Sequence, residues 1–255
     1  MLNIKYDIVG SFLRPAAIKE ARAKYNSGEI TLTDLRKVEN EEITRLVDTE
    51  VAHGLQIVTN GEFRRRWWHL DWLKEFEGFT TKHLDKERNG VVNHIELGYI
   101  TGKISYDPNR VHPEVEAYDF LKARAARYPG VIAKKCISGP NMILVDNYLQ
   151  MGIKEVPYYE SDVEYDDERS GSFEPWAILK GTGTTFVAGL ISTKNSKLED
   201  YDEIRRRYLE AKAVVGDNIA LSPQCGFASV EEGNCIDEET QWKKIDLLVS
   251  CRDFL

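Results

Sequence analysis

Short apolar runs that alternate with stretches of helical periodicity constrain this chain more than any other feature of its sequence. Several of these runs end in a polar turn that contains glycine, among them Gly10-Ser11 and Thr59-Asn60-Gly61-Glu62. Strands that alternate with helices favour an α/β fold with parallel strands. In such folds the residues that follow the strands meet at one edge of the sheet, where ligands bind. The polar turns are therefore the first candidates for a functional site.

The expected elements alternate along the whole chain. Pro15 opens the first helix, and either Thr31 or Thr33 caps the second. The expected strands are Ile4–Val9, Leu55–Val58, Val131–Cys136, Asp162–Tyr165, Thr184–Ile191 and Asn218–Leu221. The expected helices are Ala16–Tyr25, Thr31 or Thr33 to Gly54, Pro113–Tyr128, one after Phe173, Leu198–Val214 and Asp237–Ser250, and Val91–Tyr106 predicts a hairpin. About six core strands are two fewer than a (β/α)8 barrel requires.

Composition indicates a globular protein and argues against some partners. Of the 255 residues 42% are hydrophobic and 30% charged, which suits a chain with a substantial core. The net charge of -8 disfavours nucleic acid or an anionic membrane as the main partner. We expect no membrane span and no signal peptide, because no run has the length or pattern of either. Four widely spaced cysteines then predict reduced thiols and a cytoplasmic location.

Cys225 stands just past the last expected strand, in the sequence Ser222-Pro223-Gln224-Cys225-Gly226-Phe227. A lone cysteine beside a strand is more often a small buried hydrophobe than a functional residue. Its position at a strand end, in a chain with carboxylates after other strands, also suits a zinc ligand. Two ligands do not hold zinc tightly, and the sequence contains no His-x-Cys, Cys-x-x-Cys or His-Glu-x-x-His motif.

Other clusters also have two interpretations. The acidic run Glu164–Glu168 either supplies carboxylates to a site or is a solvated loop that pairs with Arg169. Glu62 either belongs to the same site or balances the arginines that follow it. The five histidines share no metal-ligand spacing. Three tryptophans form either part of the core or one wall of a pocket for a flat ligand: Trp67, Trp68 and Trp72.

Four motifs in combination resemble the cobalamin-independent methionine synthase family. They are Ile8-Val9-Gly10-Ser11-Phe12-Leu13-Arg14-Pro15, Asn60-Gly61-Glu62-Phe63-Arg64-Arg65, Glu164-Tyr165-Asp166-Asp167-Glu168-Arg169-Ser170-Gly171 and Ser222-Pro223-Gln224-Cys225-Gly226-Phe227. The similarity runs from about residue 4 to residue 250 and is greatest to the short single-barrel branch, which corresponds to the C-terminal catalytic half of the long enzymes. It implies one catalytic (β/α)8 barrel domain over residues 1–255.

The resemblance also implies a function and a set of site residues. Family members hold a zinc ion that binds homocysteine as its thiolate, and the long enzymes transfer a methyl group to it from a methylated folate. Cys225 and Glu164 resemble zinc ligands, with Asp166 possible in place of Glu164. Ser11 resembles the residue that binds the carboxylate of the amino acid, and Glu62 the acid that holds its ammonium group. Such a pair of groups suits a zwitterion.

Several departures from the family pattern matter. The family has a His-x-Cys pair of zinc ligands and an Asp-rich turn in a region that is shorter here, between Pro140 and Glu164. The strands that a complete barrel needs are missing from the same stretch, so we expect a barrel with residues missing between about 142 and 162. Ser192 stands where the long enzymes have a proton-shuttling His, and Asn60 replaces the usual acid.

Three functions remain open from the sequence. The first is a zinc-dependent S-methyltransferase that makes methionine from homocysteine or a related thiol, with methylfolate, a methylated corrinoid or another methyl compound as donor. The second is a degenerate, non-catalytic barrel that binds an amino acid through Ser11 and Glu62. The third is a hydrolase that uses two carboxylates, Glu62 and Glu164.

Overall fold

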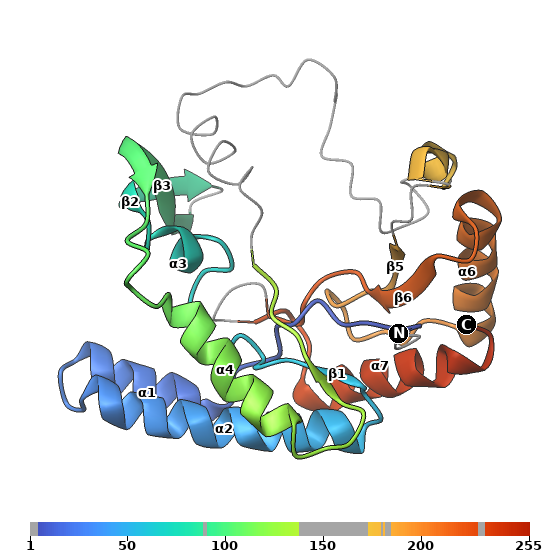
Figure 1. The fold of residues 1–255 in the computed structure, drawn as a ribbon, viewed down its shortest axis with the longest axis horizontal. Coiled ribbons are helices and arrows are strands. Elements are labelled where there is room, and N and C mark those ends of the chain that lie inside the picture. The colour runs from blue at the N-terminus through green and yellow to red at the C-terminus, as the bar shows by residue number, and fades with distance from the viewer. Residues whose placement is uncertain (1–4, 89–90, 138–172, 180, 182–184, 229–232) are drawn as a thin grey trace. The chain divides into compact units, whose positions relative to one another are not determined.

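The computed structural model describes residues 5–88, 91–137, 173–179, 181, 185–228 and 233–255 (Figure 1). The α-helices in these ranges are α1 (Ala16–Asn26), α2 (Leu32–Ala52), α3 (Leu70–Leu73), α4 (Pro113–Ala125), α6 (Tyr201–Val215) and α7 (Glu238–Ser250). Two 3-10 helices are η2 (Glu174–Leu179) and η3 (Cys251–Asp253). The strands are β1 (Ile57–Val58), β2 (Glu77–Arg88), β3 (Val91–Ser105), β4 (Ile132–Ala133), β5 (Phe186–Ile191) and β6 (Ile219–Pro223). None of the described helices is both long and apolar enough to cross a bilayer.

The chain divides into two compact units. The first comprises Met1–Arg64, Tyr118–Lys135 and Glu164–Leu255, and the second comprises Arg65–Ala117 and Cys136–Val163. All the expected site residues fall within the first unit. A single catalytic domain over residues 1–255 stays a prediction.

Parallel strands form the frame of the first unit. β1 pairs with β4 in parallel, with Ile57 opposite Ile132, and β5 pairs with β6 in parallel, with Phe186 opposite Ile219. The N-terminal segment also lies alongside β6, where Asp7 N donates to Leu221 O at 2.8 Å and Leu221 N donates to Lys5 O at 3.0 Å. The expected strand Ile4–Val9 is thus represented by a parallel bridge at Tyr6.

The helices of the first unit cover these strands with apolar faces. α6 contacts β5 and β6, α7 contacts β6, and α2 contacts β1, while α1 lies along α2 (Figure 1). Each of three helices contributes buried residues three or four positions apart to one core cluster: Ile43 and Val47 of α2, Ile204 and Tyr208 of α6, and Ile245 and Leu248 of α7. Burial of a large apolar side chain contributes roughly 1.5–3 kcal/mol, so this shared core holds helices and strands together.

The mixed α/β architecture agrees with the sequence prediction, but the barrel is not closed in the described part of the chain. The described strands form three two-stranded sheets. The strand expected at Asp162–Tyr165 and the short stretch between about 142 and 162 lie outside the described residues. A complete eight-stranded barrel therefore stays a prediction, and the helix expected after Phe173 is the six-residue 3-10 helix η2.

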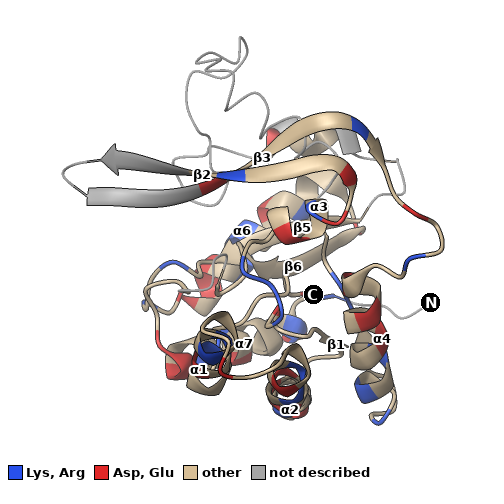
Figure 2. Ribbon diagram, turned by 90° about the vertical axis from the view of Figure 1, so that its left-hand side faces the viewer, with Lys and Arg blue, Asp and Glu red and all other residues tan. Residues whose placement is uncertain are grey.

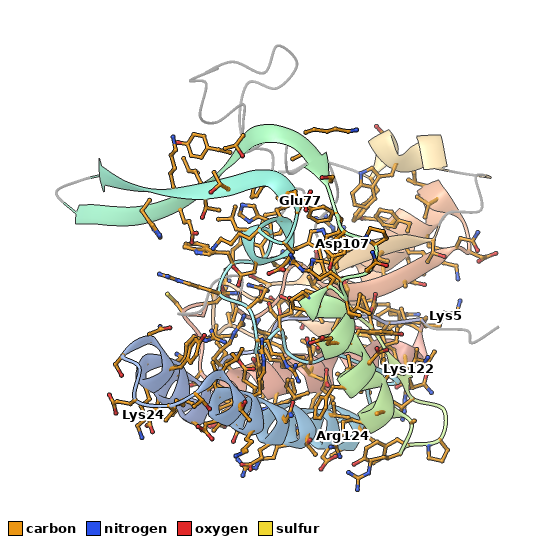
Figure 3. The ribbon with its side chains drawn as sticks, turned by 60° about the vertical axis from the view of Figure 1, so that its left-hand side comes forward. Lys5, Lys24, Glu77, Asp107, Lys122 and Arg124 are labelled. Carbon is orange, nitrogen blue, oxygen red and sulfur yellow. The ribbon has the colours of Figure 1, made fainter. Side chains whose placement is uncertain are left out.

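The second unit contains a hairpin whose position the sequence prediction placed wrongly. Val91–Ser105 is a single strand, β3, and its antiparallel partner is the preceding strand β2. The sequence prediction missed β2 because this strand is rich in charged residues and lacks an apolar alternation. At the open end of the hairpin, the Ser105 hydroxyl donates to the carboxylate of Glu77 at 2.6 Å (Glu77 is labelled in Figure 3).

Charge placement supports the helices locally. α4 begins with acidic and ends with basic residues (Figure 2), and Lys122 and Arg124 stand in its last turn (Figure 3). Lys24 occupies the same position in α1. Cations near a helix C-terminus are stabilising because the backbone carbonyls there carry partial negative charge.

A capping box begins α2 and decides between the two candidate caps. The Thr31 hydroxyl accepts a hydrogen bond from Asp34 N at 3.2 Å, and Thr31 N donates to the Asp34 carboxylate at 3.2 Å. Thr31 is therefore the N-cap, and Thr33 lies inside the helix.

The matched substitutions Thr31→Ala and Thr33→Ala test this assignment. We expect Thr31→Ala to lower the free energy of unfolding by about 1 kcal/mol, because it leaves a helix-terminal N–H without its acceptor. Thr33→Ala removes an exposed side chain and should change the free energy by less than about 0.5 kcal/mol. Urea unfolding measures both, and an equal loss in the two variants would contradict the assignment.

Candidate functional site

The turns that carry Ser11 and Cys225 are packed directly against each other. Phe227 N donates to Ser11 O at 2.9 Å, and Ala228 N donates to the Ser11 hydroxyl at 3.3 Å. A Cβ atom on Gly226 would lie 1.8 Å from Ser11 Oγ, so only glycine allows this approach. Ser11 is 3% exposed, and no acceptor for its hydroxyl proton occurs among the described residues. Its hydroxyl oxygen thus acts as an acceptor for the N–H of Ala228.

The turn that carries Glu62 is bonded to the turn of Ser11. Phe12 N donates to Gly61 O at 3.1 Å, and the Thr59 hydroxyl donates to Gly10 O at 2.7 Å. These bonds join the segment after the N-terminal bridge to the segment after β1. The structure therefore brings the Ser11, Glu62 and Cys225 turns together, as expected for residues that follow the strands of a parallel α/β fold.

Glu62 has a strained backbone. Its φ is +56°, and it is the one non-glycine with positive φ among the residues that the structure describes. The Asn60 side chain stabilises this conformation, because its Oδ1 accepts a hydrogen bond from Glu62 N at 3.0 Å. Such a conformation costs about 1–3 kcal/mol and occurs more often at functional sites than elsewhere. The strain therefore marks Glu62 as a functional candidate independently of the motif.

Arg14 connects the three turns and was not singled out as a site residue from the sequence. Its side chain is 4% exposed and donates to Phe12 O at 2.9 Å, Ala228 O at 3.0 Å and Glu62 O at 3.0 Å. The sequence signal was an arginine between a strand-end turn and the proline that opens a helix. A planar guanidinium with several fixed donors suits such a role better than lysine does.

A fourth turn, which carries Ser192, borders the turn of Cys225. Gln224 N donates to Ile191 O at 2.9 Å, and Asn234 Nδ2 donates to both Thr193 O at 2.9 Å and Gly226 O at 3.1 Å. Ser192 N donates to a Glu199 carboxylate oxygen at 2.9 Å. That carboxylate is paired with Lys244, whose side chain is fully buried. Ser192 therefore lies on the same edge as the other candidate residues.

The metal donors in the described residues do not make a complete site. Cys225 is partly exposed rather than buried as a simple core residue, and none of the four cysteines forms a disulfide. Glu164, Asp166 and Arg169 lie outside the described residues. Among the residues that are described, no group of three His, Cys, Asp or Glu side chains is placed to hold a metal ion. Since zinc sites use three or four protein ligands, the described residues do not by themselves form such a site around Cys225.

Other residues from the sequence analysis have structural contacts. His53 pairs with Asp246 and stacks on Trp242. Trp67 and Trp72 pack against a small apolar cluster of the second unit, whereas Trp68 is exposed. Burial raises the pKa of the Cys251 thiol to about 11, so this cysteine is not a reactive thiolate.

These observations define a class of protein, an α/β protein with parallel strands whose strand-end turns form a polar edge. No family model matches the sequence. Solved structures that match nearly the whole chain include the following two. One is a Listeria monocytogenes protein provisionally named a vitamin-B12-independent methionine synthase, with a TM-score of 0.69, 25% identity and 98% of each chain covered.

The second structure is a B12-independent methionine synthase from Shewanella sp. W3-18-1 in complex with selenomethionine. It matches with a TM-score of 0.64 over 98% of this chain and 97% of that chain, and its 11% identity shows a common fold alone. The present chain is related to the cobalamin-independent methionine synthase family, as its motifs predicted. The family resemblance is thereby confirmed.

Two Bacillus subtilis (strain 168) proteins, YxjG and YxjH, are also similar to this chain, and both are uncharacterized. Each is 28% identical over 350 aligned residues, which cover 94% of this chain and 91% of the relative. Since 94% of a 255-residue chain is far fewer than 350 residues, the relatives carry residues within the aligned region that have no counterpart here. This difference agrees with the expected shortening relative to family members.

The contact between Gly226 and Ser11 is open to a direct test. We expect Gly226→Ala to lower the free energy of unfolding by about 1–3 kcal/mol, because the new methyl group forces Ser11 or the turn to move. Gly102→Ala is the matched control, since a Cβ there meets its nearest atom at 3.9 Å. Denaturant unfolding of both variants measures the difference. Equal stability of the two variants would contradict the packing of Ser11 on Gly226.

Proposed function

We propose that this protein is a zinc-dependent S-methyltransferase that transfers a methyl group to homocysteine or a related thiol, in methionine biosynthesis. The observation that carries the proposal is the convergence of the Ser11, Glu62 and Cys225 turns through direct hydrogen bonds and the shared donor Arg14. In this proposal a complete (β/α)8 barrel forms one catalytic domain over residues 1–255. The relation to the methionine synthase family supports the reaction class.

The amino-acid end of the substrate is recognised by Ser11 and Glu62. The Ser11 hydroxyl is oriented by the N–H of Ala228, which leaves its proton to donate to the substrate carboxylate. Glu62 supplies the negative charge that an ammonium group requires. The Shewanella structure with selenomethionine supports an amino acid of this shape as ligand.

The thiol end of the substrate lies toward Cys225. Cys225 and Glu164 are the proposed zinc ligands, with the remaining ligands from residues outside the described ranges. Zinc lowers the pKa of a bound thiol, so that a thiolate is present at neutral pH. The protein's own contribution is to hold the amino-acid end so that the sulfur faces the methyl donor.

The possible methyl donors differ in whether their leaving group requires a general acid at the position of Ser192. The Ser192 hydroxyl accepts a hydrogen bond from Lys194 N at 3.3 Å within its own turn. An alkyl hydroxyl is a poor general acid at neutral pH, and the nitrogen leaving group of a methylfolate requires one. This position favours a donor that does not need protonation by Ser192, such as a methylated corrinoid or another activated methyl compound.

Metal content gives the first test. We expect about one zinc per chain in the native protein and loss of most of it in Cys225→Ser. A catalytic zinc site has about three protein ligands, so removal of one weakens zinc binding strongly. Cys235→Ser is the matched control, since Cys235 is an exposed cysteine. Elemental analysis measures the ratio. Absence of zinc from all three proteins would instead support the non-catalytic amino-acid-binding barrel.

Ligand binding gives the second test. We expect methionine to bind, and Ser11→Ala and Glu62→Gln each to weaken binding about 10- to 100-fold, the cost of losing a hydrogen bond to a charged group. Glu41→Gln, an exposed change on α2, should leave the affinity unchanged. Calorimetric titration measures all four proteins. If Cys225→Ser is harmless to activity while Glu62→Gln and Glu164→Gln abolish it, the two-carboxylate hydrolase replaces this proposal.

A further inference from the structure

Glu50 is a fully buried carboxyl group that contacts Thr59, the residue that begins the Glu62 turn. It lies in the last turns of α2 and is 0% exposed. Thr59 N donates to its two oxygens, at 3.0 Å to Oε1 and 3.2 Å to Oε2. The Thr59 hydroxyl oxygen lies 3.3 Å from Glu50 Oε1. The proposed methyl transfer assigns no role to this acid.

The distances around the Thr59 hydroxyl favour a proton on Glu50. The Thr59 hydroxyl has one proton, and its shortest contact is with Gly10 O at 2.7 Å, which can only accept. Gly61 N donates to the same hydroxyl oxygen at 3.2 Å. If Glu50 were ionised, its Oε1 would face this oxygen with no proton between them. A proton on Glu50 Oε1 completes the network, because the Thr59 oxygen then accepts two hydrogen bonds and donates one.

No described cation compensates a charge on Glu50. Burial raises the pKa of Glu50 well above the usual value, and hydrogen bonds from Thr59 oppose this only in part. Arg14 donates to three carbonyls, and Lys134 donates to Asp7 and to Ile8 O. Charged groups on the elements around Glu50 include Asp7 and Arg14 before and after the first turn, Glu62 after β1, Lys134 after β4, Asp48 in α2 and His53 just after it. An unpaired buried charge is costly, and such a group takes up a proton instead.

We propose that Glu50 is a protonated, neutral acid at neutral pH and that it positions the turns carrying Ser11 and Glu62. It links α2 to Thr59, and Thr59 in turn binds Gly10 O and Gly61 N. It is a positioning residue, because its contacts are to the turns. The positioning of substrate groups rests on the proposed function, whereas the protonation of Glu50 does not.

The pH dependence of stability tests the proton. In the unfolded chain Glu50 titrates near 4.5, and in the folded protein its pKa is higher. The stability that this proton contributes is therefore complete below the unfolded pKa and is lost as the pH rises through the folded pKa. Glu50→Gln keeps an acceptor for Thr59 N and a donor for the Thr59 hydroxyl but does not titrate.

We expect the unfolding equilibrium constant of the wild type to rise about tenfold per pH unit relative to Glu50→Gln within that window. Denaturant unfolding at a series of pH values measures the ratio, and Glu41→Gln is the exposed control. A ratio that does not change with pH would overturn the proposal. Carboxyl carbon NMR of the wild type gives a readout that needs no variant. One glutamate must keep its protonated shift where the others have ionised, and its absence would also overturn the proposal.

Methionine affinity tests the positioning role. Glu50→Gln should retain affinity within about threefold, whereas Glu50→Ala leaves Thr59 without its partner and should lose about tenfold or more. Equal affinity of Glu50→Ala and wild type would overturn the positioning role. If the wild type itself binds no methionine, the proposed function fails, and the pH series still decides whether Glu50 is protonated.

Discussion

The candidate site depends on one buried guanidinium. Arg14 donates to the carbonyls of Phe12, Glu62 and Ala228, and so ties together segments that are far apart in the sequence. Hydrogen bonds from a charged donor contribute about 1.5–3 kcal/mol each, which is comparable to the cost of a left-handed residue. The same group thereby stabilises the strained backbone of Glu62 and fixes its distance from the Cys225 turn. Parallel strands bring the turns to one edge, but Arg14 sets how those turns meet.

Two further buried polar groups support these turns. They differ in charge, because one belongs to an ion pair and the other is a neutral acid in our proposal. Lys244 is fully buried and paired with Glu199, which accepts from the N–H of Ser192. Glu50 has no such cation among the described residues around it and supports Thr59 as a neutral acid in our proposal. The Ser192 turn thus rests on an ion pair, whereas the Glu62 turn rests on a neutral acid in this proposal.

The sequence predicted most of the elements because local signals mark them. Pro15, a threonine cap at residue 31 or 33 and the apolar periodicity of α2 are all short-range features, and the structure confirms them with Thr31 as the cap. The hairpin was misplaced because β2 owes its strand conformation to pairing with β3 and not to its own residues. The motifs also predicted that the Ser11, Glu62 and Cys225 turns share an edge. Arg14 and Glu50 could not be assigned from the sequence, because their roles depend on contacts between distant segments.

The departures from the family pattern change the chemistry of the edge and leave its scaffold intact. Asn60 replaces an acid, yet its Oδ1 still accepts from Glu62 N, a bond that a carboxylate would also make. Relative to the family pattern, the substitution removes a negative charge beside Glu62. Ser192 likewise keeps its turn through Glu199 and Lys194 but supplies no titrating group at neutral pH. In the proposed function, amino-acid recognition by the Ser11 and Glu62 turns is thus separable from proton transfer to the methyl donor, for which Ser192 lacks the acid.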